Sequence, residues 1–145
     1  MQKILIIGGG YAGFYTAFKL EKYLSEQEAE ITLVDPLPYM TYQPFLPEVV
    51  AGSIEARHTV VSHRRHLKKT NIVSGKMTNL NHANKTVTVK LNNGHETTLS
   101  YDQVVVTAGA VSRTFPIPGV ADNAIGLKTV EEAVEIRNRI LTNFD

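Results

Sequence analysis

KILIIGGGYAG, residues 3–13, is the stretch of sequence that decides the fold. Residues 3–7 are apolar and rich in β-branched side chains, which is typical of a strand buried on both faces. The run stops at three glycines, and residues 12–24 then place small and apolar side chains on one face at helical spacing. A second apolar run at 31–34 follows a polar connection. Residues 3–35 therefore predict a β-α-β unit, the building block of a parallel sheet.

The glycine loop fits the pattern G-x-G-x-x-G, with glycines at Gly8, Gly10 and Gly13. In that pattern Gly8 allows a tight turn, Gly10 lets a pyrophosphate approach the backbone, and Gly13 lets the helix pack close to the strand. The following helix offers free N–H groups and a positive dipole end to a diphosphate. Asp35 lies 22 residues after Gly13, where a carboxylate can bind ribose hydroxyls and would repel the 2′-phosphate of NADP. We predict a dinucleotide site; the alternative is a glycine-rich turn that binds no nucleotide.

The middle of the chain predicts short helices followed by a change of period. We expect a short helix at 48–51, a longer helix at about 59–69 and a third short strand at 71–73. Apolar and polar side chains alternate over residues 86–91, and alternation resumes over 97–101. Asn93-Gly94 is a strong hairpin signal there, because its two-residue turn needs positive φ at both central positions. Residues 77–101 therefore predict a small antiparallel β-meander.

The predicted fold class is α/β, with a Rossmann-like parallel sheet of about four strands and the meander as a crossover. Residues 103–107 form the fourth apolar strand, and the spatial order is third, second, first, fourth. Thr129 and Glu132 form a capping box that opens a helix at about 130–143. The apolar face of that helix would comprise Ala133, Ile136 and Ile140, flanked by Val130 and Leu141. The fourth strand would be an exposed sheet edge, through which we expect the chain to form a homodimer or to swap strands.

Composition bounds the functions that the chain can have. Its 145 residues fit about one domain, and a net charge of +1 gives no global field for nucleic acid. The absence of cysteine excludes a disulfide framework and a thiolate zinc site. His63 and His66 share one face of a predicted polar helix without a nearby carboxylate, so we expect no metal site. The basic residues of that helix predict a solvated face; the alternative is a patch that binds anionic lipid or phosphate.

The chain resembles the N-terminal FAD segment of the glutathione-reductase-like flavoprotein superfamily, and within it the type II NADH dehydrogenases. Three stretches carry the resemblance, the first being the 8–13 fingerprint together with Asp35. Residues 42–52 are similar to the family's Q-P-L-L stretch, which lies beside the flavin ring. Residues 104–119 resemble the second FAD motif, A-T-G followed by P-x-I-P-G, although the order here is T-A-G.

The resemblance implies FAD as the cofactor. It also implies NADH as co-substrate, bound by a domain absent here, and a quinone as electron acceptor in the full-length protein. The implied cofactor-binding residues are Gly8, Gly10, Tyr11, Ala12, Gly13, Asp35, Pro36, Gln43, Pro44, Met77, Thr107, Ala108 and Gly109. Residues 10–13 would face the pyrophosphate and Asp35 the adenosine ribose. Gln43 and Pro44 would line the isoalloxazine, Met77 would lie at the adenine, and the last three residues would pass close to the FAD chain.

The missing cysteines argue against the disulfide reductases and sulfide:quinone enzymes of the superfamily, which need them. Electron transfer would then belong to the flavin itself, and we assign no catalytic acid, base or nucleophile. Residues 1–145 are expected to be the N-terminal portion of a FAD-binding domain, inactive without the rest of the protein. The full-length protein is expected to be peripheral on the cytoplasmic face of the membrane. The alternatives are a ferredoxin- or rubredoxin-reductase-like enzyme and a non-catalytic nucleotide-binding module.

Overall fold

The computed structural model describes residues 1–144, which form two compact units. The first unit comprises residues 1–40 and 62–109, and the second comprises residues 41–61 and 110–144. The glycine loop lies in the first unit. Within the described residues, no helix combines the length and the apolar character needed to cross a membrane.

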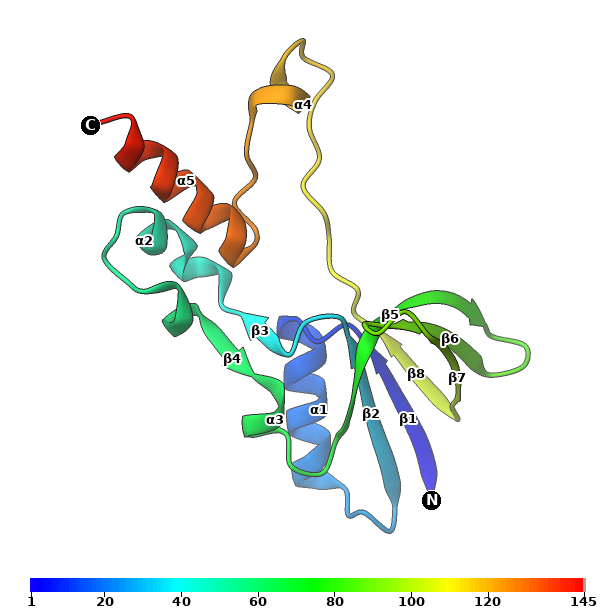
Figure 1. Ribbon diagram of the computed structural model, residues 1–145. Coiled ribbons are helices and arrows are strands. Elements are labelled where there is room, and N and C mark those ends of the chain that lie inside the picture. Colours follow the sequence, from blue (N-terminus) through cyan, green and yellow to red (C-terminus); the bar gives the residue numbers. More distant parts are fainter. Residues whose placement is uncertain (145) are drawn as a thin grey trace. The chain divides into compact units, whose positions relative to one another are not determined.

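The first unit is built on a six-stranded sheet in the order β7-β6-β5-β2-β1-β8 (Figure 1). Its strands are β1 (Gln2–Ile7), β2 (Ala29–Asp35), β5 (Asn71–Asn81), β6 (Thr86–Leu91), β7 (Glu96–Ser100) and β8 (Gln103–Val106). β5, β2, β1 and β8 are parallel neighbours. This confirms the predicted spatial order of third, second, first and fourth strand.

Both faces of β1 are buried, as its continuous apolar run predicts. Leu5 and Ile7 belong to a core cluster with Val89 of β6, so the meander covers this face of β1. Helix α1 (Tyr11–Tyr23) covers the opposite face, and Ala17 in the middle of α1 is fully buried (Figure 1). Each large aliphatic side chain buried in this way contributes about 1.5–3 kcal/mol to folding. The strand and helix that carry the glycine loop are therefore fixed by the core.

The third strand and the first strand of the meander are one element, contrary to the prediction. The first part of β5 pairs with β2 in parallel, and its second part pairs with β6 in antiparallel. The predicted hairpin at Asn93-Gly94 is present, but only Gly94 has positive φ, at +90°. The Gly94 N–H donates to the Leu91 carbonyl. Because Leu91 N–H donates to the His95 carbonyl, the loop comprises three residues, 92–94. It is a turn followed by a left-handed glycine rather than the predicted two-residue turn.

The second unit is small and mostly helical. Its elements are η1 (Gln43–Phe45), α2 (Leu46–Val50), η2 (Ala56–Thr59), α4 (Val120–Asn123) and α5 (Val130–Thr142). The core of this unit is formed by Leu46 and Val49 of α2 with Ala133 of α5. The predicted capping box is confirmed: Glu132 N–H donates to Thr129 Oγ1 at 3.1 Å, and Thr129 N–H donates to Glu132 Oε2 at 3.0 Å. The start of α5 is therefore well defined.

The predicted apolar face of α5 is only partly correct. Ala133 is fully buried, but Ile136 is half-buried and Ile140 is 42% exposed. Val130, which flanks the predicted face, packs beside the core cluster, and so does Val134. The first turns of α5 therefore make the contacts with α2, and helical spacing alone did not show how far along the helix the contact extends.

The predicted helix at 59–69 is wrong. The chain forms a short strand, β4 (Val60–Ser62), which pairs with β3 (Tyr39–Thr41) in a separate two-stranded sheet. The boundary between the two units runs through these two strands. Only one helical turn follows, α3 (His63–His66). Val60 and Val61 are β-branched and favour a strand when a partner is available, and β3 supplies that partner.

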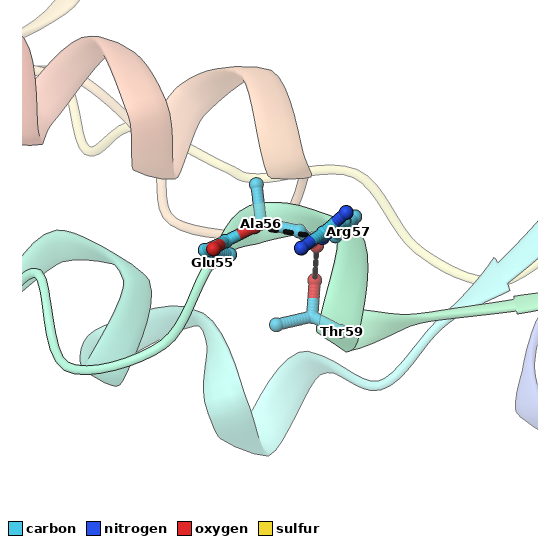
Figure 2. Close-up of polar contacts among 4 residues, drawn as sticks. All are labelled: Glu55, Ala56, Arg57 and Thr59. Carbon is cyan, nitrogen blue, oxygen red and sulfur yellow. Dashed lines mark hydrogen bonds and ion pairs between the residues drawn. The ribbon is translucent and has the colours of Figure 1, made fainter.

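The turn before β4 shows a second reason for the loss of the predicted helix. The Thr59 hydroxyl donates to the Ala56 carbonyl at 2.8 Å, so this side chain satisfies the backbone locally (Figure 2). Arg57, just before the predicted helix, lies in the second unit and pairs with Glu55 at 2.7 Å (Figure 2). The other basic residues of the segment are exposed, as predicted. These are Arg64, Arg65, Lys68 and Lys69.

Candidate functional site

Strand register gathers the predicted site residues at one edge of the parallel sheet. Ile7 of β1 pairs with Val34 of β2 and with Val106 of β8. The residues that follow these three strand positions therefore lie side by side. They are Gly8, Asp35 and Thr107. This is the carboxyl edge of the sheet, where open α/β sheets bind their ligands.

Gly8 and Gly13 are glycines because the fold leaves no room for a side chain. A Cβ on Gly8 would overlap the Thr107 carbonyl, and Gly8 has a φ of +98°. A Cβ on Gly13 would overlap the Gly8 carbonyl and lie 2.6 Å from Thr107 Oγ1. The structure thus supports the predicted roles of these two glycines in the tight turn and in the close packing of helix on strand.

Gly10 differs from both, because nothing in the fold requires it to be glycine. A Cβ on Gly10 would meet no heavy atom within 4 Å, and its φ of −68° is open to any residue. Gly10 is exposed at the start of α1, where Tyr11 and Ala12 are exposed as well. A Cβ there would project into open space at the start of α1. This open position fits the diphosphate role predicted for the second glycine of the fingerprint.

Asp35 lies directly against the glycine loop, which bears out the predicted proximity. Asp35 Oδ2 accepts from Gly9 N–H at 2.5 Å, and Oδ1 accepts from Leu37 N–H at 2.7 Å. The side chain is half-buried. Each carboxylate oxygen keeps a further lone pair, because a carboxylate can accept about four hydrogen bonds. Asp35 can therefore hold the loop and still accept hydrogen bonds from a sugar.

A cleft of about 460 Å³ opens above the glycine loop. Five of the predicted residues line it: Gly8, Asp35, Pro36, Met77 and Ala108. Leu37 and Gly75 also line the cleft, and its walls are mostly apolar. Small-molecule sites are commonly about 300–1,000 Å³ and mostly apolar with a few polar groups. The cleft has the size and character of a site for one half of a dinucleotide.

Thr107 and Gly109 lie beside the cleft rather than in its lining. The Thr107 hydroxyl donates inward to the carbonyls of Ile7 and Gly8, each at 2.9 Å. These bonds hold the end of β8 against the glycine loop. Gly109 is exposed with a φ of +72°.

Gln43 and Pro44, predicted to line the isoalloxazine, lie in the second unit. Both are exposed on η1, and the Gln43 side-chain amide donates to the Lys128 carbonyl at 3.2 Å. The adenosine and flavin portions of the predicted site therefore lie in different compact units.

His63 is a residue of the site that sequence reasoning misplaced. It was assigned to a polar helix face together with His66, yet His63 is fully buried while His66 is exposed. His63 Nε2 lies 2.8 Å from the Gly9 carbonyl oxygen. The pattern G-x-G-x-x-G allows any residue at position 9, so a third consecutive glycine was the one available hint of this contact. Among the described residues, no group of three or more His, Cys, Asp and Glu side chains is arranged to hold a metal.

Comparison with known proteins agrees with this geometry. Residues 2–142 match the model of the family described as pyridine nucleotide-disulphide oxidoreductase. The chain is 32% identical to the Arabidopsis thaliana external alternative NAD(P)H-ubiquinone oxidoreductase B2, mitochondrial, over 99% of this chain and 26% of that protein. It is 34% identical to the Staphylococcus aureus type II NADH:quinone oxidoreductase, over 99% of this chain and 35% of that protein.

The structure of NDH2 from Plasmodium falciparum in complex with NADH superposes with a TM-score of 0.85 and 28% sequence identity. That match covers 97% of this chain and 29% of the other. The chain therefore spans about a quarter to a third of the length of these relatives. These matches confirm the predicted resemblance, and the chain belongs to the pyridine nucleotide-disulphide oxidoreductase family.

Proposed function

We propose that the first unit binds the ADP half of FAD, as the N-terminal part of the FAD-binding domain of an NADH:quinone oxidoreductase. The observation that carries this proposal is the cleft lined by Gly8, Asp35 and Met77, together with the open backbone at Gly10 in the same glycine loop. The names of the Staphylococcus and Arabidopsis relatives support the wider activity. Gln43 and Pro44 on η1 are proposed to line the isoalloxazine, on the strength of the resemblance.

The first turn of α1 is proposed to hold the diphosphate. The N–H groups of Gly10, Tyr11, Ala12 and Gly13 precede the first intrahelical donor, which is Phe14 N–H bonded to the Gly10 carbonyl. N–H groups at a helix start are free to bind an anion, and the helix dipole adds a partial positive charge there. The first turn of α1 contains no acidic side chain that would repel the phosphates.

The cleft is proposed to hold the adenosine. Met77 supplies an apolar side chain for the adenine beside Gly75 and Lys76, and Asp35 supplies acceptors for the ribose hydroxyls. The Asp35 carboxylate would repel a 2′-phosphate, which FAD lacks and NADP carries. The backbone of Ala108 and Gly109 is proposed to pass close to the FAD chain, because the Thr107 side chain points inward.

Bound FAD would supply the redox chemistry, accepting electrons from NADH and passing them to a quinone. The residues of this chain contribute binding, orientation and electrostatics. They donate hydrogen bonds to the diphosphate, exclude water from the adenine, and select against a 2′-phosphate. We assign no proton transfer to any of them.

Competition with two half-ligands tests the proposal sharply. Titration of the chain with FAD, followed by the flavin fluorescence, should show saturable binding. ADP should displace FAD, because the diphosphate of ADP would bind beside Gly10 and its adenosine would occupy the cleft. FMN lacks the adenosine half and should compete poorly. Gly10→Ala is the variant expected to lose affinity. Gly52→Ala, at an exposed turn of the second unit, controls for lost stability away from the site, because its φ of +76° strains an alanine.

Each outcome of this titration has a definite meaning. Displacement by ADP and not by FMN supports the proposed site. NAD binding that is tighter than FAD binding would favour a non-flavin nucleotide-binding module. A chain that is folded but binds neither FAD nor ADP would contradict the proposal. A ferredoxin- or rubredoxin-reductase-like activity would be recognised by reduction of those protein acceptors in place of a quinone.

The edge of the sheet is proposed to pair with a further strand. β8 is the last strand of the order, and Val106 at its end is 54% exposed. An unpaired apolar edge favours strand addition. In the isolated chain we propose that this edge forms a homodimer, and sedimentation as a monomer at high concentration would contradict it.

A peripheral position of the full-length protein on the cytoplasmic face is proposed from the resemblance alone, and membrane fractionation tests it.

A further inference from the structure

His63 is a buried polar side chain that the proposed binding of FAD does not use. It is fully buried at the start of α3, and its ring stacks on Phe14 of α1 at 6.1 Å between centroids. Its backbone N–H donates to the Pro38 carbonyl at 3.0 Å. Among the described residues, its Nδ1 is buried without a hydrogen-bond partner. Burying a polar nitrogen without a partner costs free energy. The one hydrogen bond that the ring does make therefore needs a physical explanation.

That remaining hydrogen bond goes to the glycine loop. His63 Nε2 lies 2.8 Å from the Gly9 carbonyl oxygen. A carbonyl can only accept, so Nε2 carries the proton and donates it. On the other side, Gly9 N–H donates to Asp35. Both polar groups of Gly9 are therefore held by side chains, one from the end of β2 and one from α3.

The fixed Gly9 carbonyl determines where the next N–H points. The described residues contain no cis peptide bond. In a trans peptide, the C=O of one residue and the N–H of the next point in opposite directions. Because the Gly9 carbonyl points at buried His63, the Gly10 N–H points away from His63. Within residues 1–144, that N–H has no acceptor.

We propose that His63 is a positioning residue for the dinucleotide: its hydrogen bond to the Gly9 carbonyl aims the Gly10 N–H at the diphosphate. This inference rests on the proposed binding of FAD. It adds a role for a side chain that lies outside the glycine fingerprint. It also assigns Asp35 a second role, because Asp35 holds the same peptide from the opposite side.

The close packing around Gly9 supports a specific contact between Gly9 and His63. A Cβ on Gly9 would lie 2.8 Å from His63 Nε2 and 3.0 Å from Asp35 Cβ. Glycine at the permissive second position of the fingerprint therefore lets the imidazole reach the backbone. The absence of a side chain at Gly9 and the position of the imidazole therefore fit each other. Phe14 stacks on the His63 ring from α1.

Two variants of nearly equal length separate positioning from packing. His63→Gln keeps an N–H donor the same number of bonds from Cα as Nε2, and His63→Met keeps the length without a donor. Both are expected to lower the urea midpoint of unfolding. Only His63→Met should weaken ADP binding, by about five- to tenfold, the effect of one net hydrogen bond. His63→Gln should stay within about threefold of the wild type.

The Gly10 amide gives a readout that does not depend on a ligand. In the ¹⁵N–¹H spectrum of the ligand-free chain, the Gly10 peak should shift in His63→Met and stay near the wild-type position in His63→Gln. In the wild-type chain, His63 Nε2 should carry a proton that is protected from exchange. This last measurement needs no variant, so it applies even if His63→Met fails to fold.

Three results would overturn the inference. They are wild-type affinity for ADP in a folded His63→Met chain, equal losses of affinity in both variants, and an unprotonated Nε2 in the wild-type chain. Failure of the proposed function looks different, because the wild-type chain itself would then bind neither ADP nor FAD. In that case the Gly10 and Nε2 signals would still test the hydrogen bond.

Discussion

Two glycines of one fingerprint should respond in opposite ways to the same substitution. A Cβ at Gly10 meets nothing within 4 Å, and its φ of −68° and ψ of −165° suit alanine. Gly→Ala at a compatible position gains about 0.4–1 kcal/mol through the unfolded state, and loss of glycine at a helix N-cap costs a similar amount. The free energy of unfolding of Gly10→Ala should therefore stay within about 1 kcal/mol of the wild type.

Gly13→Ala should instead destabilise the fold. Its Cβ would overlap the Gly8 carbonyl, and the Thr107 hydroxyl lies 2.6 Å away. Overpacking costs about 1–3 kcal/mol even where side chains can yield, and here the obstacle is backbone. We expect a loss of at least about 3 kcal/mol, measured by urea denaturation followed by circular dichroism.

Ligand binding should show the reverse pattern. A methyl group at Gly10 would occupy part of the space for the diphosphate and weaken a charge-assisted hydrogen bond worth about 1.5–3 kcal/mol. The affinity of Gly10→Ala for ADP should fall by roughly 10- to 100-fold while the chain remains folded. Unchanged ADP affinity in Gly10→Ala would refute this reasoning, and so would wild-type stability in Gly13→Ala.

Three further predictions concern stability. Burial raises the pKa of Glu21, but hydrogen bonds from residues 68–70 outweigh that effect and leave this pKa below its usual value of 4.5. Glu21→Gln should cost about 1 kcal/mol at neutral pH. In urea melts the difference should shrink as the pH falls below 4.5 and through the lowered pKa of this carboxyl. Thr129→Ala should cost about 1 kcal/mol by removing the capping box, and a cost near zero would contradict that role. Gly9→Ala should be much less harmful in a His63→Ala background than in the wild type, and additive costs in this double-mutant cycle would show that the two residues do not interact.

The first half of the parallel sheet could be predicted because its signals are local. The apolar run before Gly8 and the spacing to Asp35 define strand, turn, helix and strand without reference to the rest of the chain. The order of the four parallel strands followed, and so did the gathering of Gly8, Asp35 and Met77 at one cleft. Parallel register brings residues at the strand ends together whatever the intervening segments do.

The segment from Thr59 to His66 could not be predicted in the same way. Its structure depends on β3, a strand of three residues that no periodic pattern announces. Once β4 pairs with β3, the chain turns and carries His63 into the interior beneath the glycine loop. The role of His63 is therefore a tertiary property, and a polar-looking sequence of histidines, arginines and lysines conceals it.

A crystal structure of the chain with ADP bound would test the central claim most directly. We expect the β-phosphate to accept a hydrogen bond from the Gly10 N–H, the ribose hydroxyls to donate to Asp35, and the adenine to lie beside Met77. ADP bound elsewhere on a folded chain, with the space above Gly10 taken up by protein side chains, would contradict the account.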